Sequence, residues 1–485
     1  MAKTNILGGA YAARTFNEAD NRMVNLFPEV VSEGGKEPGY LNRTPGLRFL
    51  ATVGTGPIRG FWTLGAFSYV VSANKLYKVD KTWTATLLGT VASGTDPVSM
   101  SDNGIQIFIA CNPRGFIYNI NTGAFVELLT SVVPGSESFF PGAKTVTYIG
   151  GYFVYNEPNT QKIWVTKLLD GTVTDPLDFA SAEAATDNVK AVIVDHKEVW
   201  VFGAKTIEIW YNAGGVDYPL SPIQGAYIET GLEAYRSIAK VDNSLFWLGS
   251  DPRGDGIVYR ANGYTPVRVS NHALEYAIQG YETMVDAQAY SYQQEGHAFY
   301  VLTFPTANKT WVYDTATSLW HERASFSNGD LFRHRSNCQM YFNDEIVVGD
   351  YDNGNLYAFD LNVYSDYIGE QKWIRSWRAL GTGQNTLKRT IHNALQLDCE
   401  TGVGLSQGQG VIPRVALRWS DDGGHTWSNY HTRSMGQGGD YGQRVIWRKL
   451  GMTMKLRDRV YEISGTDPVK ISILGADLQM SPTGS

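Results

Sequence analysis

A strand-like unit that carries one aromatic residue recurs along the chain and constrains its fold more than any other feature. The aromatic residues lie 41–54 positions apart and are Tyr77, Tyr118, Trp164, Trp210, Tyr259, Tyr313 and Tyr357. Apolar and polar residues alternate around each of them, as in a half-buried strand, whereas a helical repeat would show an apolar stripe with a period of 3.6 residues. A repeat of this length is typical of a four-stranded propeller blade.

The repeat therefore predicts an all-β chain built around a β-propeller. A single blade leaves its apolar faces open, and a closed ring of blades buries them and protects the sheet edges. Seven aromatic marks predict about seven blades, within a range of six to eight, because the last sheet can be shared between the chain ends. The 51 glycines and the 13% of aromatic residues fit short strands joined by glycine turns.

The sequence on either side of the repeat has a different pattern. Residues 1–56 show no clear period and are punctuated by Gly34-Gly35, Pro38-Gly39 and Pro45-Gly46. We interpret them as an extended N-terminal arm with a short helix near residues 17–24, which either packs along its own domain or reaches a neighbouring subunit. The propeller is expected at 57–370 and a linker at 371–388. An antiparallel, β-sandwich-like module is expected at 389–485, with strands at 390–397, 414–419, 444–447, 460–463 and 469–474.

Charge and cysteine content exclude several classes of function. The formal net charge of −7 offers no electrostatic attraction for phosphates, which argues against sequence-specific nucleic-acid binding. Three widely separated cysteines, Cys111, Cys338 and Cys399, form no CxxC pair and indicate folding in a reducing cytoplasm. No apolar run is long enough for a membrane anchor or a signal peptide.

One turn in the C-terminal module has a recognisable motif. Ser420-x-Asp422-x-Gly424-x-x-Trp427 has the residue types and spacing of the Asp-box of β-propellers such as sialidases. Short polar side chains there can bond to their own backbone, and glycine accepts a positive φ. In those propellers the box stabilises a turn on the outer rim and carries no catalysis, so we predict a structural turn here.

Motifs for catalysis or metal binding are weak in this sequence. Asp350–Asn355 resembles the start of a calcium loop but lacks the glutamate expected twelve positions along, and we interpret it as a β-turn. The eight histidines are scattered without metal spacing, and His334 is expected in an exposed loop. No GxSxG or GxxxxGK[ST] motif occurs. We expect neither an enzyme nor a cofactor; the alternative is a glycan-binding or sialidase-like propeller.

A basic run lies in the C-terminal module. In Arg444–Lys449, basic residues alternate with apolar ones, so Arg444 and Arg448 are expected on the solvent side of a strand. Such a strand face is either simply solvated or forms an interface with an acidic partner.

Several local strings, in their order along the chain, resemble one family. They are Asn25–Pro28, Gly39–Leu47, Val347–Asp350, Gly354–Asp360 and Gly436–Gly451. Together they resemble the packaged-DNA stabilisation proteins of short-tailed bacteriophages, also called tail accessory factors or tail hub proteins. The resemblance covers nearly the whole chain, from the arm to about residue 475.

The resemblance implies a structural, non-enzymatic virion protein of the phage tail, assembled in the host cytoplasm. Such proteins form a six-fold ring below the portal adaptor, help to close the DNA channel after packaging, and dock the tail needle or nozzle and the tailspikes or fibres. The family supplies no catalytic residues. For the ring contact we expect the arm to contribute, with Arg14, Asn17, Asn21, Arg22 and Asn25, and we expect deletion of residues 1–30 to leave a folded monomer that does not assemble.

Overall fold

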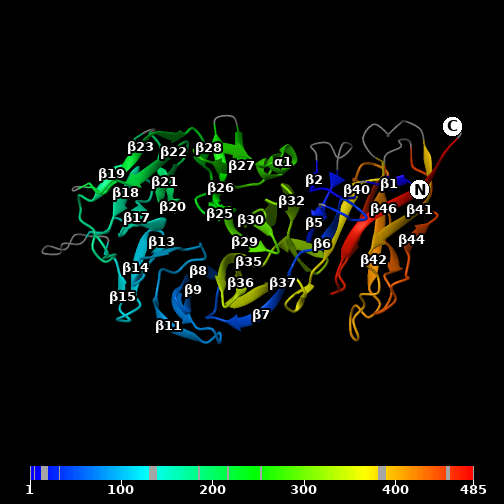
Figure 1. The fold of residues 1–485 in the computed structure, drawn as a ribbon, viewed down its shortest axis with the longest axis horizontal. Coiled ribbons are helices and arrows are strands. Elements are labelled where there is room, and N and C mark those ends of the chain that lie inside the picture. Colours follow the sequence, from blue (N-terminus) through cyan, green and yellow to red (C-terminus); the bar gives the residue numbers. More distant parts are fainter. Residues whose placement is uncertain are drawn as a thin grey trace.

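Seven antiparallel sheets surround a common axis and form a β-propeller, with a second β domain at one side (Figure 1). The computed structural model describes the chain except residues 1, 5, 13–19, 32, 130–138, 184–185, 216–217, 252–253, 381–388, 455–458 and 484–485. Within the first six blades, strands that are consecutive in sequence pair as neighbours, except that β24 and β25 of blade five both pair with β26.

The strands of these six blades have the following bounds. Blade one contains β8 (Ile58–Leu64), β9 (Phe67–Ser72), β10 (Lys75–Val79) and β11 (Ala85–Thr90). Blade two contains β12 (Ser99–Asp102), β13 (Gln106–Cys111), β14 (Arg114–Asn119) and β15 (Phe125–Glu127). Blade three contains β16 (Val146–Ile149), β17 (Tyr152–Asn156), β18 (Lys162–Val165) and β19 (Phe179–Ser181). Blade four contains β20 (Val189–Asp195), β21 (Glu198–Gly203), β22 (Ile207–Asn212) and β23 (Leu220–Ile228). Blade five contains β24 (Gly231–Leu232), β25 (Ala239–Val241), β26 (Ser244–Asp251), β27 (Gly254–Asn262) and β28 (Thr265–Arg268). Blade six contains β29 (Gln288–Gln294), β30 (His297–Phe304), β31 (Lys309–Asp314) and β32 (Leu319–Glu322).

Blade seven is completed by a strand from the start of the chain. Its first three strands are β35 (Ser336–Phe342), β36 (Glu345–Asp350) and β37 (Asn355–Asp360), and β7 (Gly46–Thr52) supplies the fourth. In the antiparallel register Tyr357 lies opposite Phe49. The packing is close at Gly46, where an added Cβ would lie 2.3 Å from the carbonyl oxygen of Val363. The ring is therefore closed by strands that lie about 300 residues apart in the sequence.

Each repeat aromatic lies in the third strand of a successive blade, which confirms the propeller and fixes the blade number at seven. Six of the seven are buried, and only Tyr77 is half-buried. The strand alternation directs these rings between neighbouring blades, as with Tyr118 of blade two, whose ring packs against that of Tyr69 of blade one.

The C-terminal domain is a two-sheet sandwich. One sheet contains β44 (Val445–Arg448), β41 (Thr390–Cys399), β46 (Ser472–Pro482), β6 (Gly39–Arg43) and β5 (Leu26–Val30), with β1 (Ala2–Thr4) also paired to β46. The other contains β4 (Met23–Val24), β40 (Trp373–Arg378), β45 (Val460–Gly465), β42 (Arg414–Ser420) and β43 (His431–Ser434). Their shared core includes Trp377, Leu395, Trp447 and Tyr461. The last strand was expected at 469–474 and instead begins at Ser472.

The N-terminal segment is woven into the sandwich, and in Figure 1 its strands lie beside those of the chain's C-terminal end. β4 pairs with β32 of blade six on one side and with β40 on the other, so one nine-stranded sheet runs from the propeller into the sandwich. The described residues of 17–24 form β3 (Asp20–Asn21) and β4 in place of the expected helix. β3 pairs with β2 (Tyr11–Ala12).

Most of the described part of the expected linker forms an interior strand, β40 (Trp373–Arg378). β40 lies between β4 and β45, and Trp373 and Trp377 are fully buried. The sequence does not reveal this because one neighbour of β40, β4, comes from the other end of the chain; residues 381–388 lie outside the described residues.

A few short elements complete the fold. They are the hairpin β33 (Ala324–Ser327) and β34 (Asp330–Arg333), the pair β38 (Ser365–Asp366) and β39 (Gly369–Glu370), and helix α1 (His272–Gln279). Asn271 caps α1 by accepting a hydrogen bond from the Leu274 N–H. Among the described residues, no helix has the length and hydrophobicity that a membrane span requires.

Candidate functional site: the propeller channel and the domain junction

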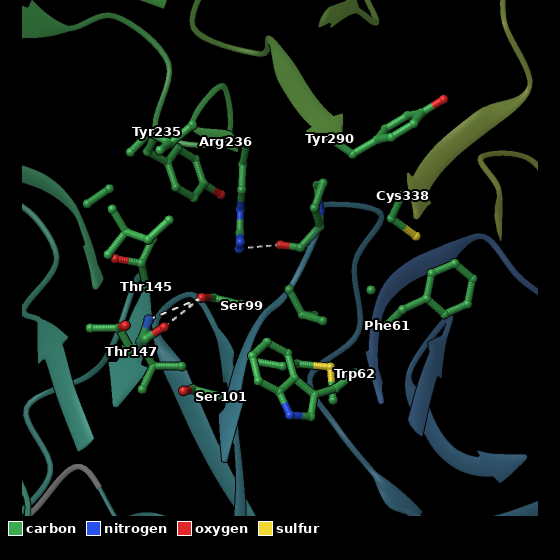
Figure 2. A pocket seen from close by; sticks show the side chains of 18 of the residues that line it. Phe61, Trp62, Ser99, Ser101, Thr145, Thr147, Tyr235, Arg236, Tyr290 and Cys338 are labelled. Atoms are coloured by element: carbon green, nitrogen blue, oxygen red, sulfur yellow. Dashed lines mark hydrogen bonds between the residues drawn. The ribbon is translucent and has the colours of Figure 1, made fainter. Parts of the chain in front are cut away.

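A cavity of about 630 Å³ lies on the propeller axis and is lined by the innermost strands of all seven blades. Figure 2 shows its wall, to which the rings of Trp62 and Tyr235 and the hydroxyls of Ser99, Ser101, Thr145 and Thr147 contribute. Each innermost strand is the edge of its sheet, so the backbone N–H groups on its unpaired side need hydrogen-bond partners from outside the sheet.

The hydroxyls of the wall satisfy the backbone of neighbouring blades. Ser99 accepts a hydrogen bond from the N–H of Val146 at 3.1 Å, and Thr145 accepts one from the N–H of Val192 at 2.8 Å. Thr147 accepts one from the N–H of Val194 at 3.0 Å. These side chains therefore join blades two, three and four. Each hydroxyl oxygen accepts a hydrogen bond from the backbone of the next blade.

Arg59 and Tyr290 of the channel do not have the surroundings that sialidase-like chemistry requires. The Arg59 guanidinium donates to three backbone carbonyls, those of Ala73, Ala92 and Asp96. Burial raises the pKa of Tyr290, and its hydroxyl bonds to Ser336. A tyrosine nucleophile needs a carboxylate partner and easier deprotonation, and Tyr290 has neither in the described part of the channel.

The calcium-like segment is a turn, as the sequence indicated. The buried carboxylate of Asp350 accepts hydrogen bonds from Arg335 at 2.7 Å and from the Tyr357 hydroxyl at 2.9 Å. No cluster of three metal-ligating side chains occurs among the described residues. Nearby His334 was expected in an exposed loop but is buried, and burial lowers its pKa well below the ordinary value.

Three of the five predicted arm residues are described, and they lie at the junction of propeller and sandwich. Asn25 is fully buried, and its amide donates to the carbonyls of Ala324 and Lys372, both at 2.7 Å. Arg22 forms an ion pair with Glu322 at 3.3 Å, and its N–H donates to the Ser376 hydroxyl. Asn21 is half-buried in β3. Arg14 and Asn17 lie outside the described residues.

The N-terminal arm is held by a buried arginine, Arg375, that was not among the predicted site residues. Arg375 of β40 is 1% exposed and donates to the carbonyl of Ile6 at 2.8 Å. Burial lowers its pKa to about 10. The signal was present in the sequence, because an arginine between two buried tryptophans on the same strand face must point inward.

Arg444 and Arg448 are exposed on and beside β44, an edge strand of the sandwich, as the alternation predicted. Arg444 donates to the side-chain oxygen of Gln396. β44 belongs to a different sheet of the sandwich from β4, the strand that follows Arg22 in the chain.

The Asp-box motif forms the expected turn, between β42 and β43 of the sandwich. Ser420 accepts a hydrogen bond from the Gly424 N–H at 2.8 Å, and the Trp427 indole donates to the Gly424 carbonyl at 3.0 Å. Partial burial tends to raise the pKa of Asp422, but hydrogen bonds from Ser420 and Thr426 outweigh it and lower the pKa to about 2. These contacts are all local to the turn.

Solved structures with a similar fold are distant in sequence. The extracellular domain of a two-component system from B. thetaiotaomicron is 13% identical over 86% of this chain and 58% of its own, with a TM-score of 0.44. BamB from Moraxella catarrhalis is 11% identical over 70% of this chain and 98% of its own, with a TM-score of 0.37. These scores carry no argument about function. A comparison with curated protein sequences found no match.

Two family models match the chain in the order of its domains. The model described as bacteriophage P22 Gp10, beta-propeller, matches residues 2–364. The model described as bacteriophage P22 Gp10, beta-sandwich, matches residues 373–481. The propeller with its N-terminal strands and the sandwich therefore have separate counterparts in one family. The chain belongs to the bacteriophage P22 Gp10 family, whose members are structural proteins of the phage tail linked to the stabilisation of packaged DNA.

Proposed function

We propose that this chain forms a six-fold ring below the portal adaptor of a short-tailed phage. The ring closes the DNA channel after packaging and docks the tail needle or nozzle and the tailspikes or fibres. The observation that carries the proposal is the match to both parts of the P22 Gp10 family, in order, over most of the chain. In this role the chain is not an enzyme, and it assembles in the host cytoplasm before it becomes part of the virion.

The junction between the domains supports a load-bearing role. A plug on packaged DNA has to resist force without opening, and a hinge between domains would weaken it. Here β4 lies between β32 and β40, and Asn25 bonds to both domains. Arg43 adds contacts from the arm to the carbonyls of Gln371, Asp467 and Val469.

The net charge of −7 is consistent with a channel that DNA must leave. Each phosphate bound by a lysine or arginine has to be released during ejection, and a strongly basic ring would slow this step. We therefore expect weak, salt-sensitive contact with DNA and no sequence preference.

The ring contacts are proposed to come from the arm, including Arg14, Asn17, Asn21 and Arg22, and from Arg444 and Arg448. Asn25 contributes by positioning the arm, since its side chain is buried within the chain. Charge reversal at Arg444 and Arg448 should impair assembly and leave folding unchanged, because both side chains are exposed.

Complementation of incomplete phage heads tests the proposal. Purified protein is added to DNA-filled heads that carry the adaptor and lack this component, and the retained DNA is followed over time. Retention is the expected result, and heads incubated with the Arg444→Glu, Arg448→Glu variant provide the matched control. Heads that neither bind the protein nor retain DNA would contradict the tail-hub role.

The glycan-binding alternative has less support from the described residues. The Asp-box lies in the sandwich and not on the propeller rim, and hydroxyls of the channel are used between blades. Hydrolysis of sialosides by the purified protein, or its retention on a host-glycan column, would support the glycan-binding alternative.

A further inference from the structure

One end of the propeller channel carries a cluster of cations. At the end where the chain enters the innermost strands, a second cavity of about 400 Å³ is lined by Lys144, Arg236 and Arg333. It shares Pro97, Tyr235, Arg236, Gln288 and Asn337 with the channel cavity, so the two cavities adjoin. Both volumes fall within the range of natural ligand sites, about 300–1,000 Å³.

The cations of this cavity lie against aromatic rings. The Lys144 ammonium is 4.4 Å and the Arg236 guanidinium 4.7 Å from the centre of the Tyr235 ring. Arg333 lies 3.7 Å from the centre of the Tyr351 ring. Figure 2 shows Tyr235 and Arg236 side by side at the channel wall. Such rings hold cations in place without neutralising them.

The three cations of this cavity outnumber its two carboxylates, Asp96 and Asp286. None of the three lies within ion-pair distance of a carboxylate in the described part of the chain, whereas neighbouring Lys190 has Glu233 and Arg335 has Asp350. Arg236 donates to the carbonyl of Pro97, but its Nε is buried without a hydrogen-bond partner. Burial lowers the pKa of Lys144, and the charges of Lys190 and Arg236 lower it further.

The same cavity also contains acceptors. The Oδ1 of Asp286 is buried without a partner, while its Oδ2 accepts from the Thr306 N–H at 2.7 Å. Asp96 also lines this cavity. These carboxylates would repel a phosphate, which carries up to two charges, but they can accept N–H groups that accompany a single carboxylate in a peptide.

We infer that this end of the channel binds an acidic polypeptide segment from another tail component, with a carboxylate held by Lys144, Arg236 and Arg333 and backbone N–H groups facing Asp286. The inference extends the docking role proposed above. It concerns the isolated chain, so a failure to bind peptide would leave the outcome of the complementation experiment unchanged.

Fluorescence anisotropy with the full-length protein tests the site. The probe is a fluorescein-labelled peptide of alternating glutamate and alanine, and the control peptide has glutamine in place of glutamate. The acidic peptide should bind at least tenfold more tightly at low salt and more weakly as salt rises. Equal binding of the two peptides would overturn the inference.

Substitutions at the two ends of the channel test where the peptide binds. The double variant Lys144→Gln, Arg333→Gln should weaken binding at least tenfold, and Lys240→Gln, at the other end of the channel, should change it less than twofold. Hydrogen exchange on the unaltered protein provides a second readout, with peptide-dependent protection expected at 95–97 and 285–288. Protection only elsewhere, or displacement by inorganic phosphate at a tenfold lower concentration than by acetate, would overturn the peptide assignment.

Discussion

Asn25 connects the two domains through a single side chain. Its amide nitrogen donates to Ala324 and to Lys372, and its amide oxygen accepts from the Ala324 N–H at 3.0 Å. Its backbone has a φ of 53°, a conformation that asparagine tolerates better than most residues. Asparagine at this position therefore both tolerates the positive φ and forms the three hydrogen bonds between the domains.

Replacement of Asn25 separates these two requirements. Asn25→Ala should lower the free energy of unfolding by about 2–4 kcal/mol, because it leaves buried backbone groups unpaired and strains a positive φ. Asn25→Gly loses the same bonds without the strain and should cost about 1 kcal/mol less. Urea denaturation measures both values. Equal costs for the two variants would show that the backbone conformation contributes nothing.

His297 fastens the arm to blade six. Its Nδ1 lies 2.8 Å from Asp314 and its Nε2 lies 3.2 Å from Glu29 of β5. The hydrogen bond to Asp314 raises the pKa of His297, against the effect of burial, and Glu29 raises it further. Adjacent His321 stays neutral, because burial lowers its pKa to about 3.

This arrangement predicts a pH dependence of stability. A pKa raised by folding means that the folded chain holds the proton more tightly, so the contribution is complete below the unfolded-state pKa of about 6.5 and is lost as the pH rises through the folded-state value. His297→Gln should therefore cost about 1–3 kcal/mol at pH 6 and less at pH 9. Denaturation curves of both proteins across this range test it, with His272→Gln as a control at an exposed histidine. If the stability lost through His297→Gln increased with pH, the predicted pH dependence would be wrong.

At the scale of elements, the N-terminal strands serve two domains in different ways. β7 completes blade seven, while β1, β4, β5 and β6 belong to the sandwich sheets. Ile6, Met23 and Leu26 are all at most 1% exposed within the sandwich core. The segment is part of the fold, which replaces the expectation that residues 1–30 can be removed without loss of folding.

Deletion of residues 1–30 should unfold the sandwich and spare the propeller. Loss of three large buried side chains, at about 2–5 kcal/mol each, is comparable with the whole stability of a domain, about 5–15 kcal/mol. β7 begins at Gly46, so blade seven stays closed. Limited proteolysis followed by mass spectrometry should show cleavage within 373–481 and protection of 57–364. Equal protection of both ranges would show that the sandwich folds without residues 1–30.

The whole molecule is joined as one body by the nine-stranded sheet and by a buried polar contact of Arg323. Arg323 follows the last strand of blade six and donates at 2.8 Å to the carbonyl of Pro45, which lies between β6 of the sandwich and β7 of blade seven. If the domains separated, this cation would lose a partner while still buried, at a high cost in free energy.

The propeller and the sandwich should therefore unfold together. Differential scanning calorimetry is expected to show one transition with matching calorimetric and van't Hoff enthalpies. The Asn25→Ala variant, weakened at the junction, should separate it into two. Two resolved transitions in the unaltered protein would contradict the coupling of the domains.

The sequence by itself determined the blades. Strand alternation, turn residues and the spacing of the seven aromatics act over short distances, so they could be read without the fold, and each mark does lie in a third strand. The Asp-box turn was likewise predictable, because Ser420, Asp422 and Gly424 bond to one another within five residues.

Only the tertiary structure decided how the blades close and where charges meet. Phe49 pairs with Tyr357, and Met23 with Arg375, and no local pattern encodes either match. Lys144 precedes β16, Arg236 precedes β25 and Arg333 ends β34, and these three separate segments meet at one cavity only because the ring closes. The physical reason is that strand pairing depends on complementary edges and shared burial, which residues hundreds of positions apart acquire only when the chain folds.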